Sequence, residues 1–262
     1  MSKTILLNQN WIFSKEGHDE PVTLPHTWNA IDGQDGGNDY YRGTCCYTTV
    51  LPDIVLPENG RAVLQFDAVA MTAEVYLNEQ KLAEHKGGYS AFCVDITDAL
   101  RNGSNLLRVN VDNSDNDTVY PQKADFTFYG GIYRDVTLHV VPAAHFVLAE
   151  NGAVPVRVTP IVTDLDARRC EVTVEAAVVG AESVTFTLDG QQMSVAVKDG
   201  NARAVFTLEH THLWDGLDDP HLYTVTARLD NGETETARFG CRKFEIDPQK
   251  GFFLNGHPYP LR

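Results

Sequence analysis

A run of aromatic residues, glycines and carboxylates between Asp125 and Asp135 contains the residue types best suited to binding a sugar. The run reads Asp-Phe-Thr-Phe-Tyr-Gly-Gly-Ile-Tyr-Arg-Asp. Flat aromatic faces can pack against the C–H faces of a sugar ring, and a carboxylate can accept short hydrogen bonds from two neighbouring hydroxyls. A core strand with a bend at the Gly-Gly pair accounts for the same residues, so the run by itself leaves both interpretations open.

An acid-rich stretch at residues 112–117 offers oxygen ligands but does not match a calcium loop. An EF-hand needs glycine at its sixth position and glutamate at its twelfth. Counted from Asp112, these positions hold Asp117 and Lys123. We expect a solvated turn here, with a polar loop at the rim of a sugar site as the alternative.

No other motif assigns a reaction to the chain. His210 and His212 lie on one side of a strand, but two ligands do not make a zinc site. The sequence has no GxSxG, P-loop, GxGxxG or HExxH motif. It has 36 acidic residues, and spacing cannot select from them a paired general acid and nucleophile.

Composition limits the partners and the location. The net charge of −15 makes nucleic acid and anionic membrane surfaces poor partners. No apolar run approaches 18 residues, and the apolar residues 5–7 are too few for a signal-peptide core. The five cysteines are an odd number, include the adjacent pair Cys45-Cys46 and form no CxxC, which favours reduced, mostly buried thiols over disulfides or zinc. Together these features predict a cytoplasmic location.

The elements that must position the candidate residues are almost all strands. Apolar and polar residues alternate in residues 62–66, 73–77, 106–111 and 135–141. Asn-Gly and Asp-Gly pairs between such segments predict tight hairpin turns with positive φ angles. Many short strands of this kind predict an all-β fold of sandwiches.

A break near residues 142–155 divides the pattern into two domains. Residues 1–145 predict a jelly-roll, galactose-binding-like sandwich, and residues 146–243 an immunoglobulin-like β-sandwich without the Cys…Trp…Cys arrangement. Residues 244–262 follow, and within them residues 252–262 predict a hairpin whose second arm has only begun at Arg262. We therefore expect a truncated or artificial end.

Eleven stretches carry a family resemblance, in this order along the chain: residues 8–13, 24–29, 40–43, 75–78, 87–89, 92–97, 125–136, 213–215, 220–223, 239–242 and 253–262. Residues 24–29 read Leu-Pro-His-Thr-Trp-Asn, and residues 40–43 read Tyr-Tyr-Arg-Gly. In this order the stretches resemble glycoside hydrolase family 2, which includes β-galactosidases and β-glucuronidases. The resemblance covers essentially the whole chain.

The resemblance implies that the chemistry lies in a domain beyond Arg262. In this family a (β/α)₈ barrel follows, and such a barrel needs about 250 residues. Its two glutamates, an acid/base and a nucleophile, perform retaining hydrolysis through a glycosyl-enzyme intermediate. The 262 residues are therefore expected to be a non-catalytic N-terminal fragment, with no catalytic residue and no hydrolysis of its own.

The resemblance also implies two substrate-binding residues. The aspartate that opens the family's motif contacts sugar hydroxyls and in some galactosidases binds sodium, and that position is Asp125. Asn38 matches a loop asparagine with a similar role. Some galactosidases have a tryptophan soon after the aspartate, where this chain departs with Phe126-Thr127. Tyr120 and Tyr129 either line the same site or pack in the core.

We therefore expect the N-terminal part of a cytoplasmic β-galactosidase-type enzyme of carbohydrate metabolism. Its partners would be a β-galactoside, its own catalytic barrel and, as in many family members, further copies of itself. The alternative enzyme is a β-glucuronidase, which would take its carboxylate-binding cations from the barrel. A free-standing carbohydrate-binding module is the alternative from another class, and the barrel lead-in at residues 252–262 argues against it.

Overall fold

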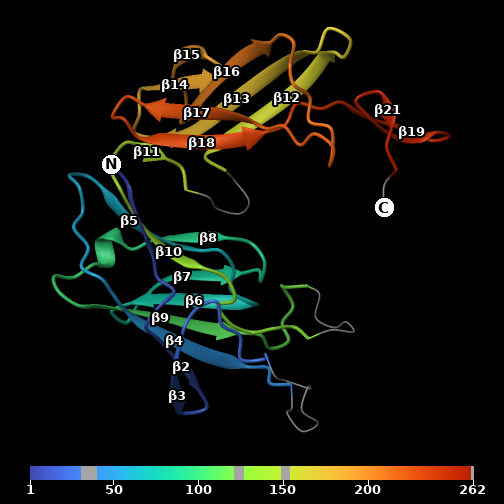
Figure 1. Ribbon diagram of the computed structural model, residues 1–262. Coiled ribbons are helices and arrows are strands. Elements are labelled where there is room, and N and C mark those ends of the chain that lie inside the picture. The colour runs from blue at the N-terminus through green and yellow to red at the C-terminus, as the bar shows by residue number, and fades with distance from the viewer. Residues whose placement is uncertain (31–39, 121–126, 149–153, 261–262) are drawn as a thin grey trace. The chain divides into compact units, whose positions relative to one another are not determined.

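The computed structural model describes residues 1–30, 40–120, 127–148 and 154–260. The chain divides into two compact units. One comprises mainly Ser2–Ala143, and the other comprises Ala144–Val147 and the chain from Val154 (Figure 1). Each unit is described by itself below.

The first unit is a jelly-roll sandwich of two antiparallel sheets. The six-stranded sheet has the order β3 (His18–Val22), β2 (Trp11–Lys15), β4 (Thr44–Leu51), β9 (Asn105–Asp112), β6 (Thr72–Leu77) and β7 (Gln80–Lys86). The four-stranded sheet has the order β1 (Lys3–Leu6), β10 (Val136–Val141), β5 (Arg61–Phe66) and β8 (Phe92–Asp95). A short 3₁₀ helix, η1 (Thr97–Ala99), follows β8.

Alternation in the strands builds the core between these sheets. In β5 the side chains of Ala62, Leu64 and Phe66 are fully buried, while the residues between them face outward. Tyr47 of β4 and Trp11 of β2 belong to the same core cluster and are also fully buried. Burial of large apolar side chains at about 1.5–3 kcal/mol each is the main force that holds the two sheets together.

The second unit is an immunoglobulin-like sandwich. In its first sheet β13 (Arg169–Val179) pairs with β12 (Val156–Asp164), β16 (Asn201–Leu208) and the short β11 (His145–Phe146). The second sheet has the order β15 (Gln191–Ala196), β14 (Ser183–Leu188), β17 (Tyr223–Leu229) and β18 (Thr234–Phe239). The predicted turn at Asp189-Gly190 joins β14 to β15 with φ angles of +48° and +76°, as a tight hairpin requires.

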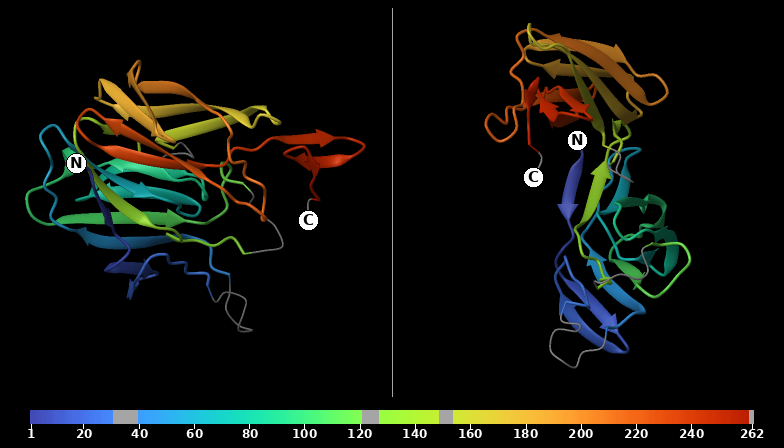
Figure 2. Two further views of the ribbon diagram at one scale, coloured as in Figure 1. Left: turned by 45° about the horizontal axis from the view of Figure 1, so that its top comes forward. Right: turned by 90° about the vertical axis from the view of Figure 1, so that its right-hand side faces the viewer.

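A small sheet ends the described chain. It consists of β19 (Phe244–Asp247), β20 (Gly251–Leu254) and β21 (His257–Pro258), and it stands apart from the other strands of its unit in the views of Figures 1 and 2. Asn255 in its β20–β21 turn donates from Nδ2 to the backbone oxygen of Trp214 at 3.0 Å. This bond fixes the turn to the immunoglobulin-like unit.

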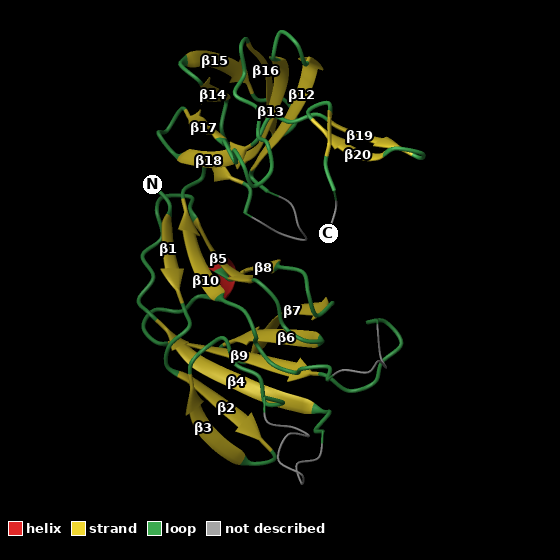
Figure 3. Cartoon of the chain, turned by 45° about the vertical axis from the view of Figure 1, so that its right-hand side comes forward, coloured by secondary structure: helices red, strands yellow, loops and turns green. Residues whose placement is uncertain are grey.

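The predicted all-β architecture is confirmed. Strands make up nearly every regular element of the described residues, and η1 is their one helical turn (Figure 3). None of the described residues forms a helix long and apolar enough to cross a membrane.

Candidate functional site

The two candidate substrate-binding residues, Asn38 and Asp125, lie outside the described residues. The residues that follow each of them on the chain are described, and a hydrogen bond joins these two stretches. Tyr40, just after the first segment, donates a hydrogen bond from its hydroxyl to the backbone oxygen of Phe128, just after the second, at 2.5 Å. The described chain that follows each segment is therefore held together at Tyr40 and Phe128.

A buried pair of asparagines holds the stretches that begin at Tyr40 and Phe128 against the sandwich. Asn113 directly follows β9 and is fully buried, and Asn29 is 1% exposed. Asn113 Oδ1 accepts from the amide of Gly43 at 2.9 Å, and its Nδ2 donates to Asn29 Oδ1 at 3.2 Å and to the oxygen of Phe128 at 3.3 Å. Asn29 Oδ1 also accepts from the amide of Gly130 at 2.7 Å. Buried polar groups need such partners, so this network specifies one arrangement of the loops.

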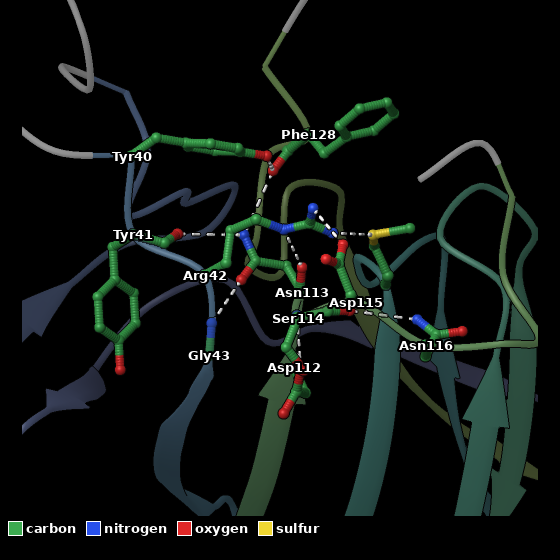
Figure 4. Close-up of polar contacts among 11 residues, drawn as sticks. Tyr40, Tyr41, Arg42, Gly43, Asp112, Asn113, Ser114, Asp115, Asn116 and Phe128 are labelled. Atoms are coloured by element: carbon green, nitrogen blue, oxygen red, sulfur yellow. Dashed lines mark hydrogen bonds and ion pairs between the residues drawn. The ribbon is translucent and has the colours of Figure 1, made fainter. Parts of the chain in front are cut away.

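Arg42 completes the arrangement from the β4 side (Figure 4). Its Nε donates to the backbone oxygen of Asn113 at 2.7 Å, and its guanidinium forms an ion pair with Asp115 at 2.7 Å. The guanidinium carbon lies 5.9 Å from the ring centroids of both Tyr40 and Phe128. Asp115 is 68% exposed, so the ion pair itself contributes little. Contacts to four residues on three chain segments give Arg42 its role, which is to hold these segments in register.

The Gly-Gly pair of the aromatic run is required by close packing. A Cβ on Gly130 would lie 2.0 Å from the Trp28 ring, and Gly131 has a φ of +135°. The amide of His26 donates to the oxygen of Ile132 at 2.8 Å, and Ile132 is fully buried. The second half of the aromatic run is therefore a core element packed on residues 24–29, as the structural interpretation predicts. Its first two residues, Asp125 and Phe126, lie outside the described residues.

Two aromatic side chains beside the described loops face solvent. Tyr120 is 73% exposed and Tyr129 is 45% exposed, so neither packs in the core. Both flank residues 121–126 on the chain.

The acid-rich stretch forms a self-capped turn. Asp112 accepts hydrogen bonds from the amide of Ser114 at 2.6 Å and from the hydroxyls of Ser114 and Thr44. Partial burial opposes the ionisation of Asp112, but these hydrogen bonds and the charge of Arg42 outweigh it and hold the pKa of Asp112 below its ordinary value. The described residues contain no group of three or more acidic, histidine or cysteine side chains placed to hold a metal ion.

A pocket of about 580 Å³ lies beside this turn, on the outer face of β4, β9 and β6. Polar side chains line most of it: Thr44, Thr72, Glu74, Lys86, Asn110 and Asp112. Several of them already have hydrogen-bond partners. Glu74, for example, accepts hydrogen bonds from Asn110, which also lines the pocket, and from Tyr76 and Lys81 beside it. The pocket is therefore a polar surface of the six-stranded sheet beside the turn at residues 112–117.

His210 and His212 do not converge on one ligand. His212 Nε2 lies 2.6 Å from Asp219 Oδ2, and its ring stacks on His221 with centroids 4.0 Å apart. His210 is exposed and has a φ of +53°.

Sequence reasoning did not single out Arg42, Asn29 or Asn113. Each is a polar residue outside the strands that the sequence predicts, where exposed turns are expected. The available signal was indirect, since Asn29 and Arg42 lie within two of the family-like stretches, 24–29 and 40–43. Sodium at Asp125 stays a prediction, because that residue is outside the described part.

Comparison with known proteins gives two family matches that follow one another along the chain. Residues 2–142 match the model "Glycosyl hydrolases family 2, sugar binding domain", and residues 139–242 match "Glycosyl hydrolases family 2". A β-glucuronidase of Bacteroides fragilis is 34% identical over 98% of this chain, and a β-galactosidase of Thermoanaerobacterium thermosulfurigenes is 28% identical over all of it.

Solved structures of β-glucuronidases and of a putative β-galactosidase are similar to this chain as well. The crystal structure of an FMN-binding β-glucuronidase from Facaelibacterium prausnitzii L2-6 matches the whole chain with a TM-score of 0.90 and 37% identity. A putative β-galactosidase from Bacteroides fragilis matches 98% of it with a TM-score of 0.84 and 30% identity. This chain spans 40% of the length of the B. fragilis β-glucuronidase and 42% of the F. prausnitzii structure.

Proposed function

This chain belongs to glycosyl hydrolase family 2, and we propose that it forms the non-catalytic N-terminal part of a longer retaining β-glycosidase. The observation that carries the proposal is the pattern of coverage. β-Glucuronidases and β-galactosidases match this chain from end to end, yet it accounts for less than half of each of them. The two catalytic glutamates would lie in the remainder.

The chain's own contribution would be a sugar-binding edge at the loop end of the jelly roll. The hydrogen bond from Tyr40 to Phe128 brings together the stems of the segments that carry Asn38 and Asp125. A carboxylate and an amide that start from one point can bind neighbouring hydroxyls of a single sugar ring. Asp125 would accept hydrogen bonds from two hydroxyls and so orient the ring toward the catalytic groups. Its carboxylate would also be a ligand for sodium.

The network beneath these segments supports that role. Asn113 and Asn29 are buried, and Arg42 bonds Asn113 and Asp115 in the segment that follows β9. A binding carboxylate must be held within a fraction of an ångström to act in a transition state, and a polar network at the described residues next to these segments would supply that rigidity. The immunoglobulin-like unit would act as a spacer that packs against the catalytic domain.

We propose a β-glucuronide as the first substrate candidate. The relatives with 34% and 32% identity are a β-glucuronidase and a putative β-glucuronidase, and a solved structure with 37% identity is that of an FMN-binding β-glucuronidase. A β-galactoside is the second candidate. Residues 24–29 and 40–43, with the sequences Leu-Pro-His-Thr-Trp-Asn and Tyr-Tyr-Arg-Gly, favour it.

A titration followed by ¹H–¹⁵N NMR tests the binding role in the chain as it stands. We expect glucuronate or galactose to shift amides around residues 38–43 and 125–130, with an affinity weaker than about 10 mM because much of the subsite is absent. Asp125→Ala should abolish these shifts, and Asp117→Ala, a control in the neighbouring exposed turn, should leave them unchanged. Shifts confined to other surfaces would refute the role of Asp125, and sub-millimolar binding would favour a free-standing binding module.

A further inference from the structure

The small sheet at the end of the described chain has one apolar face. Residues that lie opposite each other in an antiparallel pair point to the same side of a sheet. Strand register places Phe244 opposite Leu254 and Ile246 opposite Phe252, so these four side chains share one face. The charged residues of β19 point to the other side, and neither strand contributes a charge to this face.

Part of this face is open to solvent. Ile246 is 75% exposed and Phe244 is 61% exposed, whereas Leu254 is buried. The Phe244 ring stacks on the Phe252 ring with centroids 6.2 Å apart, and the Phe252 ring meets the Tyr259 ring edge-on at 6.3 Å. These contacts join Phe244, Ile246, Phe252 and Tyr259 into one apolar strip, and the described residues leave its β19 end exposed.

A neighbouring loop extends the apolar surface. A Cβ on Gly216 would lie 2.7 Å from the Tyr259 hydroxyl, so this loop passes directly against the ring. The next residue, Leu217, is 92% exposed. Single exposed apolar residues are common on protein surfaces, but a connected set of large ones marks an interaction surface. The strip and Leu217 therefore indicate a place where another protein surface packs.

The pattern of family matches indicates which surface that is. The two family models match residues 2–142 and 139–242, so the small sheet follows both matched domains. The F. prausnitzii β-glucuronidase structure nevertheless matches the whole chain, small sheet included, and this chain accounts for only 42% of it. The small sheet is therefore shared with longer proteins, although it lies outside the range of either domain model.

We infer that the apolar strip is a docking surface for the catalytic part of the longer enzyme, which would cover it with an apolar, uncharged surface. The inference rests on the proposed function, because the proposed function supplies the occupant. A second copy of the chain is the other occupant that such a surface fits. The net charge of −15 makes two copies repel each other, whereas a domain of the same polypeptide docks without the entropic cost of association.

Docking at the strip would also hold the immunoglobulin-like unit in place. Asn255 donates from Nδ2 to the backbone oxygen of Trp214 at 3.0 Å, and its Oδ1 accepts from the amide of Lys243 at 3.0 Å. These bonds tie the small sheet to the loop that follows β16 of the sandwich. A domain that covers the strip would therefore fix the immunoglobulin-like unit against itself through the small sheet.

Hydroxyl-radical footprinting tests whether the strip is covered. The 262-residue chain and the longer enzyme, expressed from the full reading frame, are oxidised in parallel and analysed by mass spectrometry. We expect oxidation of Phe244 to fall several-fold in the longer enzyme, at every protein concentration, because a ring that is 61% exposed would become a buried one. Equal oxidation in both proteins would overturn the inference. Protection that appears only at concentrations at which the enzyme dimerises would overturn it as well, because it would assign the strip to a second copy.

A matched pair of variants tests the contribution of the strip to stability. Ile246→Lys places a charge on the strip, and Ile161→Lys is the control, because Ile161 is a 55% exposed isoleucine of β12 in the same unit. In the 262-residue chain both variants should melt like the wild type, since both side chains are exposed. In the longer enzyme Ile246→Lys alone should lower the melting temperature, by roughly 5–10 °C, because it buries an unpaired charge.

Activity of the longer enzyme separates this inference from the proposed function. Hydrolysis of 4-nitrophenyl β-glucuronide or β-galactoside by the wild type, with no effect of Ile246→Lys on melting, would overturn the docking surface and leave the proposed function standing. An inactive wild type in which Phe244 is protected and Ile246→Lys melts lower would refute the proposed function, while it would support docking of the strip onto the rest of the polypeptide.

Discussion

Replacing Asn113 with alanine should destabilise the jelly-roll unit more than any single loop contact would suggest. The side chain makes four hydrogen bonds, with Gly43, Asn29, Phe128 and Tyr41, at 2.9, 3.2, 3.3 and 3.4 Å. Its Nδ2 has only two hydrogens for the last three acceptors, so these contacts amount to about three full bonds. At about 1 kcal/mol for each lost hydrogen bond, the upper limit is about 3 kcal/mol.

The partners' remaining bonds reduce that figure slightly. The oxygen of Phe128 still accepts from Tyr40, and Asn29 Oδ1 still accepts from Gly130. The amide of Gly43 loses the side-chain acceptor it uses. We therefore expect a loss of about 2–3 kcal/mol in the free energy of unfolding, or a fall of about 5–10 °C in the melting temperature of this unit.

Differential scanning calorimetry of the 262-residue chain measures this loss. Asn110→Ala is the matched control, because Asn110 is an asparagine of β9 whose bonds to Arg108 and Glu74, at 3.1 and 3.4 Å, lie on the outer face of the sheet. The control should lose less than about 1 kcal/mol. If both variants melt at the same temperature, the asparagine pair does not hold the stretches at Tyr40–Gly43 and Phe128–Gly130 in place, and the reasoning is refuted.

Three further predictions concern packing, protonation and the small sheet. Gly130→Ala places a Cβ 2.0 Å from the Trp28 ring and should cost about 3 kcal/mol in urea unfolding; wild-type stability would show that the ring can move aside. Burial lowers the pKa of His26 and of His139 from 6.5, so the folded chain binds fewer protons than the unfolded one. The free energy of unfolding should therefore fall as the pH drops below about 6.5, and less steeply in a double glutamine variant; equal slopes would contradict this assignment. Asn255→Ala removes bonds of 3.0 Å that hold the β20–β21 turn and should speed limited proteolysis at residues 244–258, whereas unchanged cleavage would mean that the turn is held by other contacts.

The fold was predictable because its signals are local. Alternation in residues 62–66 and 73–77 marks strands that the structure has as β5 and β6 over nearly the same bounds. The Asp189-Gly190 turn follows from backbone preferences of the residues themselves. Both kinds of signal act within a few residues, so one sequence suffices to read them.

The network beneath the site was not predictable in the same way. The bond between Asn29 and Asn113 joins residues 84 positions apart, and nothing near either residue marks it as buried. An asparagine beside a strand is usually a solvated turn residue. The Gly-Gly pair was visible in the sequence, but its cause, the Trp28 ring, came only with the packing.

The most direct test of the central claim is an activity measurement on the purified chain. The account predicts that residues 1–262 release no 4-nitrophenol from 4-nitrophenyl β-glucuronide or β-galactoside above the uncatalysed rate, since the catalytic carboxylates would lie in the rest of a longer enzyme. Turnover by this chain that disappears in Asp125→Ala would contradict the account, because the two β domains would then contain a complete active site.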